Sequence, residues 1–537
     1  MTKKNKDFSN DNNKTQEKIS WEHIKISPDI ISLVPYEAAK KYQFVPLEKD
    51  HKTLRVGVVD MDDIEVQNAL QFLAEKNQLI IEMVKISEED FKSALGAYTS
   101  PAFAITKALE SISREEKVGI GKPVKEAQKE EIMKDAPVAK IVEVVLRNAI
   151  EGMASDIHIE PMEDCVRVRY RQDGILHNSL TLPKKVGPAI VSRVKILSNL
   201  KIDERRKPQD GRFRIIERGK QIDFRVSSLP VSMGEKVAMR VLDKEQGLIS
   251  LENLGIRGRN YDVIKENIFE PYGMILITGP TGSGKSTTLY SILQILNKEG
   301  VNIVTLEDPV EYAIEGINQS QVKPEIGYTF ATGLRSILRQ DPDIIMVGEI
   351  RDKETAELAV HAALTGHVVL STLHTNDSVG AIPRLVDMGV EPFLLASSLR
   401  VIVAQRLVRR ICQECKEAVR LTEAAAKNIE KVISQIPENQ RGDVDVSKGL
   451  KIYKGKGCAK CGGSGMKGRI GIFEVFSIDD RVLGLLGGSI DEEGLRKAGK
   501  EQGMITMKQD GVLKVLMGIT TLEEIERVTE EESLEID

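Results

Sequence analysis

The stretch Met274–Thr287, MILITGPTGSGKST, is the part of the sequence that most clearly indicates the fold class of this chain. An apolar run, Met274–Thr278, leads into the pattern G-x-x-x-x-G-K-[ST] at Gly279–Ser286, and apolar residues at helical spacing follow. This order predicts a strand, a glycine-rich loop and a helix, in which backbone N–H groups and the helix N-terminus bind phosphate groups. The alternative, an ordinary glycine-rich turn, does not account for the flanking strand and helix.

The pattern assigns chemistry to the loop. Lys285 is expected to reach the β- and γ-phosphates of a nucleoside triphosphate, and the Ser286 hydroxyl is expected to ligate Mg²⁺. The expected nucleotide-binding residues are Gly279, Pro280, Thr281, Gly282, Ser283, Gly284, Lys285, Ser286 and Thr287.

Short apolar runs alternate with helical stretches around this loop, which predicts a buried parallel sheet. The expected strands are Met274–Thr278, Val301–Leu306, Ile344–Val347 and Val368–Leu373. Ligands of such sheets bind beyond the carboxyl ends of the strands. The polar residues that follow these strands are therefore candidates for a functional site.

Two of these strands run into glutamates, Glu307 in EDPVE and Glu349 in GEIRD. A phosphate loop needs one acid for the Mg²⁺ shell and another to orient the attacking water, and two strand-terminal carboxylates supply both. Each glutamate alone is also compatible with a helix N-cap. Position does not decide which of them activates water; Glu349 is the first choice and Glu307 the second.

His367 and His374 flank the apolar segment VVLSTL. A histidine beside a strand is usually structural. At the carboxyl end of its strand, however, His374 is also placed to sense a γ-phosphate by hydrogen bonding. Spacing alone leaves both interpretations open.

Four of the five cysteines form two pairs. Cys412 and Cys415 make one Cys-x-x-Cys pair, and Cys458 and Cys461 make a second pair. The two pairs are separated by 42 residues. Four thiolates complete a closed, structural Zn²⁺ site. A redox dithiol needs only one pair, and four unrelated thiols do not explain the spacing. Cys165 is expected to be a small apolar residue facing a core.

Upstream of the loop, VRVRYR at 166–171 and IDFRV at 222–226 alternate apolar and charged residues, which predicts a sheet with one apolar face. A single arginine there is compatible with a solvated face. The cluster is more informative, because guanidinium groups suit planar phosphate recognition.

Composition narrows the remaining possibilities. The 537 residues are 41% hydrophobic and 29% charged, as in soluble globular proteins, and predict about three or four domains. The formal charge is −5, of which the last seventeen residues contribute −7, so a surface built for nucleic acid is not expected. The sequence shows neither a signal-peptide h-region nor an apolar run of 18 residues, so no membrane span is expected.

The chain resembles the secretion ATPases of type II secretion and type IV pilus assembly in GPTGSGKST, VTLEDPVE, DPDIIMVGEIRD and TGHVVLSTLHTND, and upstream in SDIHIEP, ERRKPQDGRF and DFRVSSLPVSMGEKVAMRVLD. The resemblance spans about residues 25–515. It implies an α/β fold with a RecA-like P-loop core, a preceding α+β (PAS-like) domain, a zinc-binding insertion and a small α/β N-terminal domain.

The resemblance also implies residue roles. Glu307 matches the Asp-box glutamate and Glu349 the Walker B glutamate. His367 and His374 match the His box. Two further residues match the phosphate-contacting arginines of the preceding domain, namely Arg225 and Arg240.

Members of this family are hexamers that bind ATP between domains of neighbouring subunits. The resemblance therefore implies a homo-hexameric ATPase that uses ATP, Mg²⁺ and Zn²⁺ and does mechanical work on an inner-membrane platform protein and a cytoplasmic adaptor. It implies a cytoplasmic location at the inner membrane, with which the protein would associate only through its partners. Nucleic acid is not expected among these partners. Many members have a longer N-terminal region that binds a cyclic dinucleotide. Residues 21–97 resemble only its second part, so such binding is not expected, and docking onto the platform is.

The expected domains are a disordered tail (1–20), a platform-docking domain (21–98), a linker (99–137), an arginine-bearing domain (138–243), a linker (244–256), the ATPase core (257–410), the tetracysteine insertion (411–470) and a helical segment with an acidic tail (471–537). Two alternatives remain open. A nucleic-acid translocase or helicase is disfavoured by 4% aromatic residues and a single Trp21. A pilus-retraction ATPase is disfavoured because those relatives are shorter and generally lack the tetracysteine element.

Overall fold

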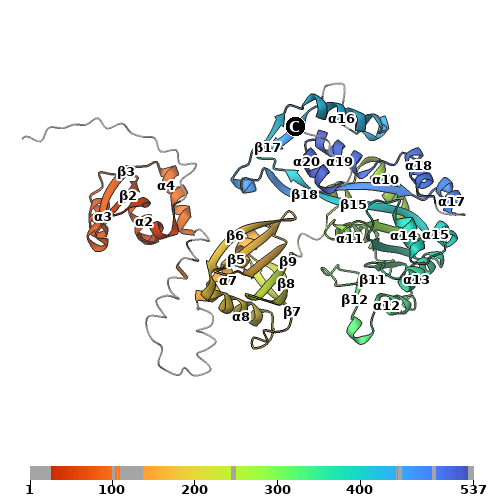
Figure 1. The fold of residues 1–537 in the computed structure, drawn as a ribbon, viewed down its shortest axis with the longest axis horizontal. Helices are drawn as coiled ribbons and strands as arrows, with labels where there is room; N and C mark the ends of the chain where they lie inside the picture. Colours follow the sequence, from red (N-terminus) through yellow and green to blue (C-terminus); the bar gives the residue numbers. More distant parts are fainter. Residues whose placement is uncertain are drawn as a thin grey trace, which may run out of the picture.

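The computed structural model describes residues 26–99, 137–243, 249–442, 450–486 and 491–529, together with Phe103, Ile105, Lys107, Ala108 and Val444. The expected tail at 1–20, most of the expected linker at 99–137 and the end of the acidic tail beyond residue 529 lie outside the described residues. The described parts contain sheets of three, six and seven strands and a two-stranded antiparallel sheet (Figure 1). None of the described helices is long and apolar enough to cross a membrane.

The N-terminal part is a three-stranded sheet, in the order β1-β2-β3, packed against short helices around buried residues such as Phe44, Val56 and Leu70. Ser87 begins α4 by accepting a hydrogen bond from the Asp90 N–H, as a capping residue does. The elements are α1 (Pro28–Ile31), α2 (Tyr36–Tyr42), β1 (Phe44–Asp50), β2 (Thr53–Val58), α3 (Ile64–Asn77), β3 (Ile80–Lys85), α4 (Glu88–Leu95) and η2 (Gly96–Thr99).

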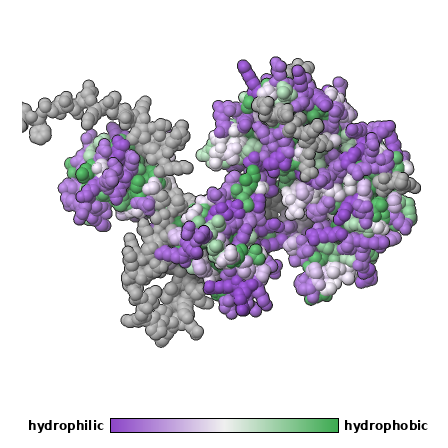
Figure 2. Space-filling model, viewed as in Figure 1, coloured by the Kyte–Doolittle hydropathy of each residue, from purple (hydrophilic) through white to green (hydrophobic). Residues whose placement is uncertain are grey.

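Several large apolar side chains of this part are exposed, among them Ile64, Phe72 and Ile80. Figure 2 shows hydrophobic atoms between hydrophilic ones on this small domain at the left of the view. Within the described residues the edge strand β3 pairs with β2 alone, so its other edge has no described partner strand.

The second part is an antiparallel sheet in the order β6-β5-β4-β9-β8-β7. Its apolar face packs on α7 and α8 through residues such as Val145, Ile190 and Phe224, and the expected alternation is confirmed. The elements are α7 (Pro137–Glu151), β4 (Asp156–Pro161), β5 (Cys165–Gln172), β6 (Ile175–Pro183), η3 (Lys184–Val186), α8 (Gly187–Leu197), β7 (Gln209–Glu217), β8 (Lys220–Val231) and β9 (Gly234–Asp243).

The third part is a seven-stranded sheet in the order β12-β11-β13-β14-β10-β15-β18, parallel except for β18. The four expected strands are confirmed as β10, β11, β13 and β14. Helices α10 and α11 cover one face, and α12 to α15 cover the other. The elements are α9 (Leu251–Leu254), α10 (Gly258–Ile268), β10 (Gly273–Thr278), α11 (Lys285–Leu296), β11 (Ile303–Glu307), β12 (Asn318–Gln321), η5 (Pro324–Ile326), α12 (Phe330–Ile337), β13 (Ile344–Val347), α13 (Lys353–Leu364), β14 (Val368–Leu373), α14 (Ala381–Asp387), α15 (Pro392–Ser398) and β15 (Leu399–Ile411).

The chain leaves the sheet after β15 and returns to it in β18. Between them lie β16 (Lys416–Val419), α16 (Glu423–Ser434), η6 (Glu438–Gln440), β17 (Ile452–Gly455) and η8 (Ala459–Cys461), and after them come β18 (Met466–Ser477), α17 (Asp480–Leu486), α18 (Glu492–Glu501), α19 (Met507–Leu516) and α20 (Leu522–Val528).

Two segments differ from expectation. Part of the expected linker forms α9, because Leu251, Leu254 and Ile256 are buried in the core of the third part. The expected helical segment begins as strand up to Ser477, because Phe473 and Phe476 are buried beside β15.

Candidate active site

The phosphate loop joins β10 to α11 at the carboxyl edge of the sheet. Gly279 and Gly284 have φ angles of +149° and +91°, and both pack against Gln405 of β15. A Cβ at Gly279 would lie 2.5 Å from the Gln405 carbonyl oxygen, and one at Gly284 would lie 2.8 Å from its side-chain Nε2. Glycine is therefore required at both positions, by backbone conformation and by space. The loop leads directly into the N-terminus of α11, a favourable place for anions.

Lys285 begins α11, and its Nζ donates to the carbonyl oxygens of Gly279 at 2.8 Å and Pro280 at 3.1 Å. Burial lowers its pKa to about 8; the negative charge of Glu349 opposes this shift, and Arg406 adds to it. An anionic phosphate bound in the loop would favour the charged ammonium. Ser286 is exposed on the first turn of α11, as a hydroxyl ligand of Mg²⁺ must be.

Glu349 lies beyond the end of β13. Its Oε2 is 2.7 Å from Nε of Arg351 and 3.5 Å from Nε2 of His374, which follows β14. Since β14 lies between β13 and β10, both side chains stand at the carboxyl edge that also carries the phosphate loop. The Glu349 side chain is 14% exposed, so a water molecule or phosphate can approach it.

Glu307 ends β11 in a different environment. The residue is buried, and its carboxylate accepts hydrogen bonds from the Tyr290 hydroxyl, from Thr305 Oγ1 at 2.5 Å and from Gln319 Nε2 at 3.1 Å. Three donors occupy most of its acceptor capacity. The two acids therefore differ: Glu307 is held within the protein, whereas Glu349 faces the site.

The two histidines are far apart along β14. His374 follows the carboxyl end of the strand and approaches Glu349. His367 precedes its amino end, where Nδ1 lies 2.9 Å from the Ala362 carbonyl oxygen at the end of α13. The structure therefore brings His374 together with the phosphate loop, and it does not bring His367 there within this chain.

Charged residues form a row across the face of the six-stranded sheet that lies opposite α7 and α8. In register, Arg212 of β7 lies beside Arg225 of β8, then Arg240 of β9, Asp156 of β4 and Arg171 of β5. Four guanidinium groups with one carboxylate make a basic stripe, which suits phosphate recognition.

One arginine of the row reaches the ATPase core. Arg225 donates to Oε2 of Glu311 at 3.0 Å and to the Val310 carbonyl oxygen, both in the loop after Glu307. The Glu311 N–H in turn donates to the Tyr290 hydroxyl, which bonds Glu307. Arg240 instead lies 3.4 Å from Asp156, within its own sheet, and is 56% exposed.

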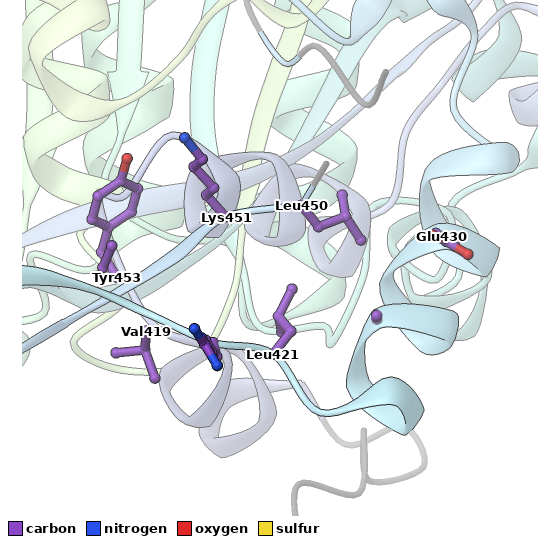
Figure 3. A pocket seen from close by; sticks show the side chains of 9 residues that line it. Val419, Leu421, Glu430, Leu450, Lys451 and Tyr453 are labelled. Carbon is purple, nitrogen blue, oxygen red and sulfur yellow. The ribbon is translucent and has the colours of Figure 1, made fainter. Parts of the chain in front are cut away.

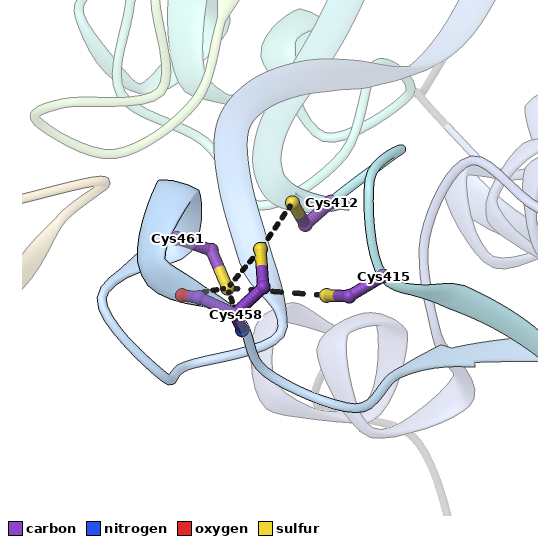
Figure 4. A group of neighbouring side chains, drawn as sticks. All are labelled: Cys412, Cys415, Cys458 and Cys461. Atoms are coloured by element: carbon purple, nitrogen blue, oxygen red, sulfur yellow. Dashed lines mark hydrogen bonds between the residues drawn. The ribbon is translucent and has the colours of Figure 1, made fainter. Parts of the chain in front are cut away.

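The four expected metal-ligating cysteines come together in one cluster (Figure 4). Their Sγ atoms lie within 4.8 Å of one another, with separations of 3.8 Å for Cys412–Cys458, 3.9 Å for Cys415–Cys461 and 3.7 Å for Cys458–Cys461. Thiolates bound to tetrahedral Zn²⁺ at about 2.3 Å would lie about 3.8 Å apart, so the cluster is compatible with zinc. Backbone N–H groups of Cys458 and Gly465 donate to the Cys461 sulfur, which favours the thiolate.

A surface pocket of about 550 Å³ lies on the tetracysteine insertion rather than at the phosphate loop (Figure 3). It is lined by β16, β17 and α16, with Arg420, Lys451 and Tyr453 around it. None of its lining residues belongs to the phosphate loop or to the glutamates and histidines at the strand ends.

The sequence patterns missed several residues that build the site. Arg351 stands within the GEIRD motif, and its pairing with Glu349 has no signal in the sequence. Glu311, the partner of Arg225, likewise lies in a quoted motif. Gln405 supports two loop glycines from β15, and no motif identifies it.

A parallel sheet with a phosphate-binding loop, acids at two strand ends and a basic stripe on a preceding sheet defines a P-loop ATPase. Residues 131–527 match the family described as Type II/IV secretion system protein, and residues 19–104 match the MshEN domain. The chain therefore belongs to the type II/IV secretion system protein family and is an ATP-hydrolysing enzyme.

Individual proteins of known class are similar to this chain in sequence or in fold. The chain is 43% identical over 518 residues to the type IV pilus assembly ATPase PilB of Myxococcus xanthus, covering 94% of this chain and 88% of that protein. It is 43% identical over 472 residues to the type II secretion system ATPase E of Vibrio cholerae, covering 86% and 91%. The Legionella pneumophila ATPase DotB has a TM-score of 0.53 at 23% identity over 72% of this chain and 94% of that one, a similarity of fold. The expected RecA-like core is confirmed.

Proposed function

We propose that this ATPase powers the assembly of type IV pili or of a type II secretion pseudopilus. The observation that carries the proposal is the similarity to a pilus assembly ATPase over 94% of this chain. We further propose that it works as a homo-hexamer at the cytoplasmic face of the inner membrane, where its N-terminal domain docks on a platform protein and an adaptor.

In the proposed reaction, residues 279–287 bind the phosphates of ATP and Lys285 neutralises the β- and γ-phosphates. Ser286 would hold Mg²⁺, which when bound neutralises negative charge on the phosphate oxygens. Glu349 orients the attacking water, because its carboxylate faces the site. His374, beside Glu349, donates a hydrogen bond to the γ-phosphate.

Arginines of the six-stranded sheet would couple hydrolysis to movement. Arg225 already contacts the loop after Glu307, and exchange of Glu311 for phosphate oxygens would draw the sheet domain toward the nucleotide. Arg240 would join it. The four cysteines would hold Zn²⁺ as a structural ion that keeps the insertion folded.

The test uses a deletion strain of the source bacterium, complemented with wild-type protein or Lys285→Ala, and counts surface pili while assaying secreted proteins. We expect one of the two processes to fail in the deletion strain and to recover only with wild-type protein. Recovery of the failed process with Lys285→Ala, or failure of neither process in the deletion strain, would contradict the proposal. DNA should not stimulate the purified ATPase, and strong stimulation would favour a nucleic-acid translocase.

A further inference from the structure

The segment after β14, His374–Ser378, is tied to neighbouring elements on several sides. The Thr375 N–H donates to Thr278 Oγ1 at 2.8 Å, and Thr278 is the last residue before the phosphate loop. Arg406 of β15 donates to the Asn376 side chain at 3.1 Å. Asp377 pairs with Arg496 of α18 at 2.6 Å. A segment held at so many points has a fixed position relative to the loop.

A further tie comes from Glu474 of β18, which makes two hydrogen bonds to one residue of the segment. Its Oε1 accepts from the backbone N–H of Ser378 at 2.9 Å and from the Ser378 hydroxyl at 2.5 Å. Glu474 is 4% exposed and Ser378 is fully buried. Burial raises the pKa of Glu474, and the two hydrogen bonds from Ser378 oppose this rise. A buried carboxyl group that lost these bonds would be left without partners for Oε1, which is costly.

This tie lies close to the proposed chemistry. Ser378 is four residues from His374, and His374 Nε2 lies 3.5 Å from the Glu349 carboxylate. A shift of the segment would therefore change the distance between His374, Glu349 and a γ-phosphate. Such misplacement by about 1 Å can cost about a hundredfold in rate.

We propose that Glu474 is a positioning residue of the ATPase: by binding Ser378 it fixes the segment that carries His374. The inference rests on the proposed role of His374 in ATP turnover. Glu474 binds Ser378 rather than His374, so its effect passes through the backbone between Ser378 and His374.

The test measures kcat and KM for MgATP in the full-length protein carrying Glu474→Ala, Glu474→Gln, His374→Ala and the double substitution Glu474→Ala/His374→Ala. We expect Glu474→Ala to lower kcat about tenfold with KM changed less than about threefold. Glu474→Gln keeps an acceptor oxygen and should retain most of the activity. The double variant should be no slower than His374→Ala, because both changes act through one side chain.

The matched control is Glu524→Ala. Glu524 is 2% exposed and also binds a backbone N–H of the same sheet, that of Arg409 at 2.8 Å, but it does not contact the site. It should lower the thermal midpoint without lowering kcat. If Glu474→Ala does not fold, Ser378→Ala removes the hydroxyl bond alone and should lower kcat in the same direction.

Several outcomes would overturn the inference: unchanged kcat in Glu474→Ala, unchanged kcat in His374→Ala, independent effects that multiply in the double variant, or an equal loss in the Glu524 control. Lys285→Ala separates these from a failure of the proposed function. An active Lys285→Ala would contradict the ATPase site itself, whereas an inactive Lys285→Ala with a normal Glu474→Ala contradicts only the positioning role.

Discussion

Glu307 and Glu349 end neighbouring strands of one sheet, yet their surroundings give them different chemistry. Glu307 is buried with three hydrogen-bond donors, and Glu349 lies beside Arg351 and His374 with part of its carboxylate exposed. A general base must reach the proton that it accepts, and only the second carboxylate has that access in this structure.

We expect Glu349→Gln to lower kcat by about a hundredfold or more while nucleotide binding persists, because the amide cannot accept the proton of water.

Glu307→Gln should destabilise the protein by about 1–3 kcal/mol, because the amide N–H₂ would face hydrogen-bond donors at a position where the carboxylate accepted hydrogen bonds. Single-turnover hydrolysis, nucleotide titration and urea unfolding measure these effects. If the Glu349→Gln variant hydrolysed ATP with a higher kcat than the Glu307→Gln variant, and the two had equal free energies of unfolding, Glu307 would be the acid that activates water.

Glu160 illustrates a charge that stabilises the fold. Burial alone would raise its pKa, but hydrogen bonds from Arg169, Lys236 and Arg167 outweigh this and lower the pKa to about 2. Because the folded-state pKa lies below the ordinary value of 4.5, the stabilisation is complete above pH 4.5 and is lost as the pH falls toward 2.

Accordingly, Glu160→Gln should lower the free energy of unfolding by about 1–3 kcal/mol at pH 7. This gap, the difference in the free energy of unfolding between the wild type and the variant, should narrow below pH 4.5. Urea unfolding of the full-length proteins at several pH values measures the gap. Glu163→Gln, at an exposed position nearby, is the control and should show none. A gap that does not change between pH 7 and pH 3 would contradict this account.

At the scale of elements, the tetracysteine insertion is separate from the phosphate site, to which it contributes no described residue. Cys458→Ser should therefore reduce bound zinc from about one ion per chain to a small fraction and lower the thermal midpoint. The KM for MgATP should stay near that of the wild type. Elemental analysis, thermal melting and ATPase assays measure the three quantities, and full zinc retention would contradict the prediction.

The elements also show what sequence alone could predict. The strands β10, β11, β13 and β14 follow from short apolar runs, and the Cys-x-x-Cys spacing predicts the cluster of four cysteines, because these signals are local. The pairing of β15 with β18 has no local signal, since the insertion separates the two strands. Gln405 of β15 contacts the phosphate loop, and Glu474 of β18 contacts Ser378, so both contacts follow only from the folded sheet. His367 precedes β14, in agreement with its place before the apolar segment VVLSTL, and its role in catalysis stays a prediction.

At the scale of the whole molecule, Arg225 links the six-stranded sheet to the ATPase core. We expect Arg225→Ala to lower kcat at least about tenfold although the residue lies outside the core, because a cation aimed at phosphate charge would be lost. Arg214→Ala is the matched control: Arg214 lies on the same sheet and pairs with Asp223 of that sheet. Equal kcat values in the two variants would contradict the coupling.

The place of β18 in the sheet has a consequence for how the protein is made. When β15 has been synthesised, its neighbour β10 is already present, but more than fifty residues remain to be added before its other neighbour, β18, begins. At about 5–20 residues per second, the open edge of β15 waits several seconds for β18. During that interval the strand that supports the phosphate loop is an unprotected edge, open to pairing with other nascent chains. The folded insertion brings the end of β15 and the start of β18 together. Its folding therefore shortens the time that β18 needs to pair with β15 once β18 has been synthesised.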